Sequence, residues 1–163
     1  MSNKADKSGD KENTLILTTE EGPVVIELLV DKAPKHAARI KELAREGFYD
    51  GLIFHRVIND FMAQGGCPDG SGMGGSKKPN LKAEFNDVSH KRGICSMARS
   101  QNPDSANSQF FIVFDDASFL DKQYTAWGKV TSGMEHIDAL PRGEPPRKPG
   151  KIVSMKVAAD VDG

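Results

Sequence analysis

Short segments of the chain alternate hydrophobic and polar residues, which is the pattern of half-buried β-strands. These segments are rich in β-branched and aromatic residues, and Gly, Pro, Asn or Asp residues separate them. The predicted strands cover 15–19, 24–30, 53–58, 94–98, 109–114, 125–130 and 152–157. The first two flank Glu20-Glu21-Gly22-Pro23, so we expect them to form a hairpin.

Helical spacing is confined to two places. One apolar stripe follows the i, i+3, i+4, i+7, i+8 spacing of an amphipathic helix and consists of Ile40, Leu43, Ala44, Gly47 and Phe48. Pro34 suits the first turn of this helix, because the N–H that proline lacks has no helical partner there. A shorter helix is predicted around 134–140, and the proline-rich segment 141–151 is expected to lead back to the last strand. Many short strands with few helices predict a β-barrel or sandwich capped by helices.

Composition limits the classes of function. The chain has 163 residues, of which 37% are hydrophobic and 28% charged, as expected for one soluble globular domain. Its formal net charge of −1 provides no electrostatic footprint for nucleic acid or an anionic membrane. Residues 1–13 are polar and contain no apolar run, so we expect a flexible tail before a single domain over 14–163.

The number and spacing of the cysteines indicate the cellular compartment of the protein. Cys67 and Cys95 lie too far apart in the sequence for a CxxC or zinc-like motif, so they are expected to be free thiols, although pairing stays open. Two free thiols, no signal-like segment and no bilayer-spanning segment predict a cytoplasmic protein.

The long glycine-rich loop over 65–80 matches a nucleotide-binding motif in sequence but lacks the structural context that the motif requires. Gly70–Gly75 fits GxGxxG, yet no apolar strand leads into it, and Pro79 follows where a helix should begin. Nucleotide binding is therefore a minor alternative. The four histidines show no ligand spacing and are interpreted as surface or structural residues: His36, His55, His90 and His136. We expect no metal and no cofactor.

Two segments carry more specific signals. In 54–66, Arg56 lies inside an apolar β-rich run, where an unpaired charge is costly to bury, so it is expected to face a ligand or partner. In 107–112, strand alternation places Gln109 and Phe111 on one face and Phe110 and Ile112 on the other. The pattern alone leaves open whether the Gln109 face binds a ligand, and it favours a core.

Both segments resemble the signature regions of the cyclophilin family of peptidyl-prolyl cis–trans isomerases, FHR-x-I-x-x-FM-x-QGG and SQFFI. Three shorter matches support the resemblance: Gly72-x-Gly74-Gly75, Ser96-Met97-Ala98 and Trp127-Gly128-Lys129-Val130. The similarity extends over about 15–157 and implies a closed eight-stranded antiparallel β-barrel capped by two α-helices. The stretch 97–108 is similar to the bacterial cytoplasmic branch.

The resemblance also implies an active site. Arg56 matches the catalytic arginine, and no cofactor is implied. The positions that match the apolar proline pocket are Phe61, Met62, Phe111 and Leu120. Gln64 and Gln109 match groups that hold the peptide backbone, and Ala98 and Arg99 match the pair that lines the groove before the proline.

Four positions depart from the family pattern or lie at the edge of the site. Phe119 stands where a tryptophan strengthens cyclosporin binding, so only weak cyclosporin binding is implied. Tyr124 replaces a frequent histidine, Arg99 a frequent asparagine, and Met73 matches the rim of a side pocket. The implied partners are proline-containing peptides and unfolded or folded client proteins, bound by a monomer. A non-catalytic module that only binds proline segments is the alternative.

Overall fold

The computed structural model describes residues 10–161. Its strands are β1 (Thr14–Thr19), β2 (Gly22–Leu28), β3 (Arg56–Ile58), β4 (Met62–Gly65), β5 (Ile94–Met97), β6 (Phe110–Val113), β7 (Ala126–Ser132) and β8 (Ile152–Val157). The helices are α2 (Pro34–Arg45) and α3 (Met134–Asp138). Three single 3₁₀ turns, which the sequence pattern missed, are η1 (Lys11–Asn13), η2 (Ser118–Leu120) and η3 (Ala158–Asp160).

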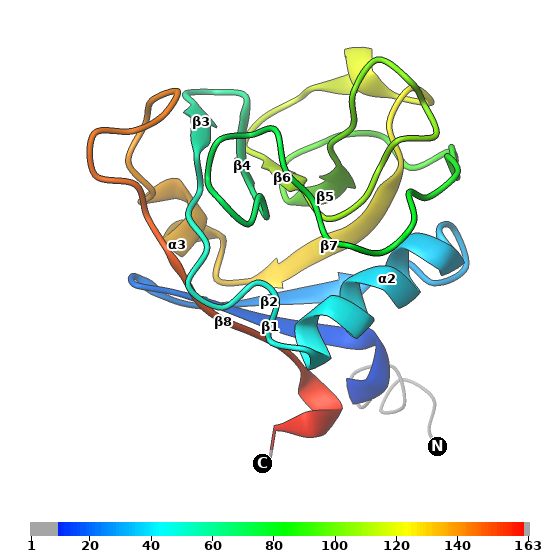
Figure 1. Ribbon diagram of the computed structural model, residues 1–163, viewed down its shortest axis with the longest axis horizontal. Helices are drawn as coiled ribbons and strands as arrows, with labels where there is room; N and C mark the ends of the chain where they lie inside the picture. Colours follow the sequence, from blue (N-terminus) through cyan, green and yellow to red (C-terminus); the bar gives the residue numbers. More distant parts are fainter. Residues whose placement is uncertain (1–9, 162–163) are drawn as a thin grey trace.

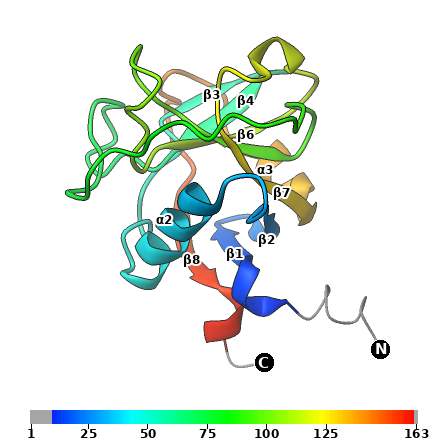
Figure 2. The ribbon, with the colours of Figure 1, turned by 90° about the vertical axis from the view of Figure 1, so that its right-hand side faces the viewer.

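All eight strands form one antiparallel sheet in the order β3-β4-β6-β5-β7-β2-β1-β8. The sheet curls strongly upon itself, with α2 against one side and α3 against another (Figures 1 and 2). The prediction of a mainly β protein with eight antiparallel strands and two helices is therefore confirmed.

The predicted closure of the barrel is slightly overstated. Within residues 10–161, the edge strands β3 and β8 do not pair with each other. Instead, the chain before β3 exchanges hydrogen bonds with Ile152, and isolated bridges join Ile53 with Lys151 and Val57 with Gly143. The loop 141–151 lies along this gap, beside β3 (Figure 1). Its four prolines lack the N–H that a continuous ladder requires, so the structure is a strongly curled half-barrel.

Strand β4 was missed by the sequence pattern. It pairs with β3 through a tight turn in which Asp60 has a φ of 63°. Most of its residues are buried, so the alternation that marks a half-buried strand is absent. The predicted strand over 53–58 is a ladder strand only from Arg56 onward.

Helix α2 begins and ends close to the predicted bounds. Pro34 is its first residue, and Gly47, just beyond its end, has a φ of 72°, the left-handed conformation that favours glycine. The apolar face, which includes Ile40 and Leu43, is buried against the sheet. The predicted helix thus covers one end of the sheet.

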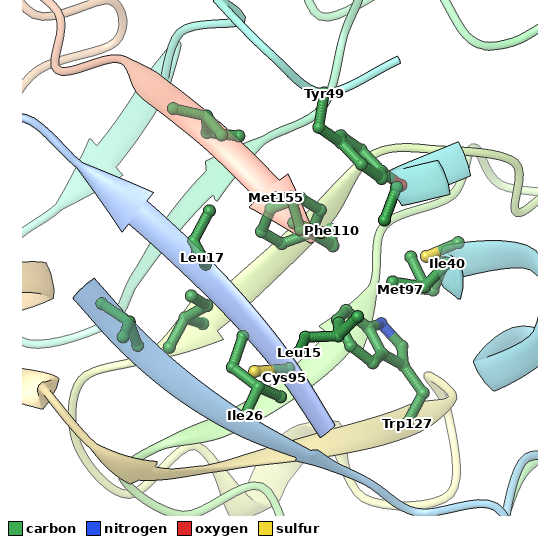
Figure 3. Close-up of a cluster of buried hydrophobic side chains, with 14 of the residues drawn as sticks. Leu15, Leu17, Ile26, Ile40, Tyr49, Cys95, Met97, Phe110, Trp127 and Met155 are labelled. Atoms are coloured by element: carbon green, nitrogen blue, oxygen red, sulfur yellow. The ribbon is translucent and has the colours of Figure 1, made fainter. Parts of the chain in front are cut away.

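The main core fills the inside of the half-barrel (Figure 3). The Phe110 ring packs edge-on against three other aromatic rings, those of Tyr49, Phe54 and Trp127. The Tyr49 hydroxyl donates a hydrogen bond of 2.7 Å to the Ser108 carbonyl, which satisfies a buried polar group. This contact also fixes the chain just before β6, where candidate site residues lie.

The end of the predicted polar tail is attached to the domain, whereas its residues 1–9 lie outside the described residues. Glu12 in η1 accepts hydrogen bonds from Arg45 (2.8 Å) and Lys41 (3.0 Å). These two bonds, Arg45 first, lower the pKa of Glu12 to about 2. Residues 10–13 therefore differ from the flexible tail that composition suggested.

Two smaller findings concern the cysteines and the helices. Cys67 and Cys95 are buried, free thiols, and burial raises the pKa of Cys95. In the stretch 10–161, neither the length nor the hydropathy of any helix is sufficient for a membrane span.

Candidate active site

A row of cross-strand neighbours runs over the outer face of the half-barrel. Arg56 of β3 lies opposite Gln64 of β4, and Gln64 lies opposite Phe111 of β6. Phe111 lies in turn opposite Ser96 of β5. Directly opposed residues point to the same face of a sheet, so these side chains leave it together. The adjacent row, which joins the main core, consists of Val57, Ala63, Ile112 and Cys95.

Beside this row lies a small apolar pocket. It has a volume of about 130 Å³ and is lined by Arg56, Phe61, Met62, Gln64, Ala98, Arg99, Phe111, Leu120 and Tyr124. Met62 and Phe111 form its buried floor, as part of a second apolar cluster separate from the main core. The volume is well below the ~300–1,000 Å³ of pockets for drug-sized ligands, so the pocket suits one small apolar group.

A chain of hydrogen bonds connects the polar side chains around the pocket. Arg56 Nη1 donates to Gln64 Oε1 at 3.2 Å, and Gln64 Nε2 donates to Gln109 Oε1 at 3.0 Å. Gln109 Nε2 donates to the carbonyls of Gly72 and Gly74 at 2.9 and 2.8 Å. The glycine loop is therefore tied to the sheet through Gln109, and the amides are held in one orientation. Arg56 Nε also donates to Glu144 Oε1, at 3.1 Å.

Two further hollows adjoin the pocket, each sharing lining residues with it. One, of about 450 Å³, is lined by Met73, Asn107 and neighbouring polar residues, and it shares Gln64, Ala98 and Arg99 with the apolar pocket. The other, of about 480 Å³, shares Arg56 and Gln64. The adjoining hollows thus offer room for the neighbours of a residue seated in the apolar pocket.

Arg99 and Tyr124 form one wall of the apolar pocket, and Arg99 also lines the hollow of about 450 Å³. The Arg99 guanidinium lies 4.4 Å from the centre of the Tyr124 ring, a cation–π distance. Its Nη2 donates to the Gln123 carbonyl at 2.6 Å, so the side chain is held down on the wall. The Tyr124 ring packs edge-on against Phe111, with 5.7 Å between ring centroids.

Behind Phe111, a buried histidine supports the pocket. The His90 ring stacks on Phe111, its Nδ1 lies 3.1 Å from Asp121 Oδ1, and its Nε2 lies 2.9 Å from Ser96 Oγ. A carboxylate can only accept, so Nδ1 carries the hydrogen and Nε2 accepts from the Ser96 hydroxyl. Burial lowers the pKa of His90, and Asp121 opposes this only in part. His90 therefore acts as a neutral structural residue.

The structure brings together the predicted site residues from six separate parts of the chain. Two of them are peripheral: Phe119 is 66% exposed and packs against Phe61 (5.7 Å), and Met73 is 89% exposed at the rim of the hollow of about 450 Å³. Sequence reasoning missed the supporting residues Glu144 and His90. The signal for Glu144 in the sequence is an acidic residue within the proline-rich loop. The signal for His90 is a histidine shortly before a buried strand.

Comparisons with known proteins identify the family of the chain. The family model described as "Cyclophilin type peptidyl-prolyl cis-trans isomerase/CLD" matches residues 14–157. A probable peptidyl-prolyl cis-trans isomerase of Brucella suis is 48% identical over 169 residues, covering 94% of this chain and 86% of that protein. Peptidyl-prolyl cis-trans isomerase B of Bacillus subtilis is 42% identical over 129 residues, covering 78% and 90%.

Solved structures agree as well. A cyclophilin from Hirschia baltica superposes with a TM-score of 0.87 at 28% identity, over 99% of this chain and 83% of that one. A Cryptosporidium parvum cyclophilin crystallised in the presence of the dipeptide Ala-Pro has a TM-score of 0.83 at 29% identity, covering 88% and 98%.

The family model, the relatives and the curled antiparallel sheet shared with the solved cyclophilins together define the class of protein. The chain belongs to the cyclophilin-type peptidyl-prolyl cis–trans isomerase family. It is accordingly an enzyme of that activity.

Proposed function

We propose that this enzyme accelerates rotation about X–Pro peptide bonds by a hydrogen bond from Arg56 to the prolyl nitrogen in the twisted transition state. The observation that carries the proposal is the Arg56 side chain, 42% exposed, which places a guanidinium at the edge of a pocket sized for one small apolar group.

The reaction breaks no covalent bond. Its obstacle is amide resonance, a barrier of roughly 18–20 kcal/mol, which makes uncatalysed X–Pro isomerisation take tens to hundreds of seconds. When the amide twists, the prolyl nitrogen loses conjugation and becomes a better hydrogen-bond acceptor. A donor that bonds the twisted nitrogen better than the planar one stabilises the transition state selectively. Arginine suits this role because it stays charged and has several donors in a rigid plane.

The remaining pocket residues hold the substrate. In this proposal the proline ring contacts Phe61, Met62, Phe111 and Leu120. Gln64 and Gln109 hold the neighbouring backbone, and the residues before proline lie along Ala98, Arg99 and Tyr124. The Ala-Pro dipeptide named with the Cryptosporidium parvum structure supports proline-containing peptides as substrates.

The test is Arg56→Ala in an isomerisation assay on a short X-Pro peptide. We expect kcat/KM to fall on the order of 10²–10³, by analogy with deletion of one transition-state donor. Peptide binding, measured by NMR titration, should persist because the apolar pocket is unchanged. Activity within tenfold of the wild type would contradict the role of Arg56. A wild type that binds the peptide but does not isomerise it would favour the non-catalytic binding module.

The location, oligomeric state and client proteins of the enzyme are also proposals. We place the protein in the cytoplasm as a monomer with one domain over 14–163, acting on unfolded or folded clients without a cofactor. The two free thiols support a reducing compartment. Weak cyclosporin binding is supported by Phe119, which offers no indole N–H at the groove edge.

A further inference from the structure

The Arg56 guanidinium has two hydrogen-bond partners, and only one of them comes from a strand of the sheet. Gln64 binds its Nη1 from β4 (3.2 Å), and the Glu144 carboxylate binds its Nε (3.1 Å). Glu144 comes from the proline-rich loop, 88 residues further along the chain. Within residues 10–161, it is the acid in ion-pair contact with Arg56.

The backbone explains why Glu144 lies there. Val57 and Gly143 exchange two hydrogen bonds, Val57 N to Gly143 O and Gly143 N to Val57 O, both 2.8 Å long. The bridge is antiparallel, so the residue after Gly143 lies opposite the residue before Val57. Glu144 is therefore the cross-strand neighbour of Arg56 on the free edge of β3, as Gln64 is on the paired edge.

The loop is fixed immediately before Glu144, by Arg142 and Gly143. Arg142 donates to the carbonyls of Asp138 and Leu140, both at 2.8 Å, and its guanidinium lies 4.5 Å from the centre of the Phe114 ring. Gly143 has a φ of 143°, and a Cβ there would lie 2.6 Å from the Cα of Pro146. Only glycine allows this path, so the backbone presents the carboxylate to Arg56.

A guanidinium that is partly exposed needs such a restraint. The arginine side chain has several rotatable bonds, and ordering it costs conformational entropy. Two partners, one at Nε and one at Nη1, define the plane of the group and leave the Nη2 hydrogens without a partner among the described residues. A small misplacement of a catalytic group can strongly reduce its contribution to the rate.

We propose that Glu144 is a positioning residue for Arg56, which raises kcat by fixing the guanidinium plane and contributes little to substrate affinity. This inference rests on the role proposed above for Arg56. It assigns a function to the loop 141–151 beyond its place at the gap between β3 and β8.

Kinetics on three variants test the inference. Glu144→Ala should lower kcat about threefold to tenfold and leave KM within twofold, because an exposed ion pair contributes modestly. Glu144→Gln should retain most of kcat, because its amide oxygen still accepts from Nε. The matched control is Asp87→Ala, which removes an exposed ion pair with Lys32 (2.7 Å) and should change neither constant. An unchanged kcat in Glu144→Ala, an equal loss in Glu144→Gln, or a change in KM alone would overturn the proposal.

A spectroscopic readout separates this proposal from the proposed function. The ¹H–¹⁵N signal of the Arg56 Nε–H, assigned by its loss in Arg56→Lys, should exchange slowly with water in the wild type and at least threefold faster in Glu144→Ala. Equal exchange rates would overturn the restraint whatever the catalytic result. A clear difference, combined with an Arg56→Ala variant of full activity, would instead refute the catalytic role of Arg56.

Discussion

Gln109→Glu replaces one amide nitrogen by an oxygen where the glycine loop is tied to the sheet. In the wild type, Gln109 Nε2 donates to the carbonyls of Gly72 and Gly74, at 2.9 and 2.8 Å. At neutral pH the introduced carboxylate has no hydrogen to donate, so one of its oxygens would face the two carbonyl oxygens of Gly72 and Gly74. The bond from Gln64 to the other oxygen is retained.

The expected magnitude follows from these contacts. Each neutral hydrogen bond contributes about 1 kcal/mol net, so losing two costs about 2 kcal/mol. That free energy corresponds to roughly a 30-fold change in an equilibrium constant, and repulsion between the oxygens would add to it. The loop is also held by Asn107, which accepts from Ser76 N at 2.8 Å. The change should therefore open the loop around Gly72–Gly74 without unfolding the domain.

Hydrogen exchange and kinetics at two pH values provide the assay. At pH 8, protection of the Gly72 and Gly74 amides should fall about 30-fold, and kcat/KM for an X-Pro peptide should fall with it. Burial and the two carbonyls favour the protonated form of the introduced carboxyl. At pH 5 the proton should restore one hydrogen bond, so part of the activity should return.

The control is Gln101→Glu, which makes the same isosteric change at an exposed position and should leave both readouts unchanged. Unchanged amide protection in Gln109→Glu at pH 8 would refute the reasoning. So would an activity of this variant that does not rise between pH 8 and pH 5.

Two predictions concern pH in the wild-type protein. The isomerisation rate should be nearly constant between about pH 6 and 9, because arginine does not titrate there. His55 beside it should not titrate there either, because burial, aided by the Arg56 charge, lowers its pKa. A steep inflection in kcat/KM would reveal a titrating catalytic group. Thermal denaturation should show stability decreasing as pH falls from about 7 toward 5: burial lowers the pKa of His36 and His90, so the unfolded chain binds more protons in this window. The double variant His36→Gln/His90→Gln should lose most of this slope, with His55 supplying the remainder because burial lowers its pKa as well. An unchanged slope would contradict the assignment.

Sequence pattern predicted the local structure well where one face of an element is buried and the other is not. Strand alternation over 109–114 separated Phe110 from Phe111, and the structure confirms that Phe110 joins the main core and Phe111 the pocket cluster. Alternation succeeds here because a one-residue shift would exchange the two faces. It failed for β4, whose residues are buried on both faces.

The candidate site could be proposed from the resemblance, but the pattern of residues left Arg56 only as a charge in need of a partner. The sequence by itself determined the strands other than β4, the two α-helices and the types of side chain available. The tertiary structure alone decided that Arg56, Gln64 and Phe111 form one row and that Glu144 reaches the same guanidinium. The physical reason is register: pairing between distant segments depends on packing of the whole sheet, which no local pattern encodes.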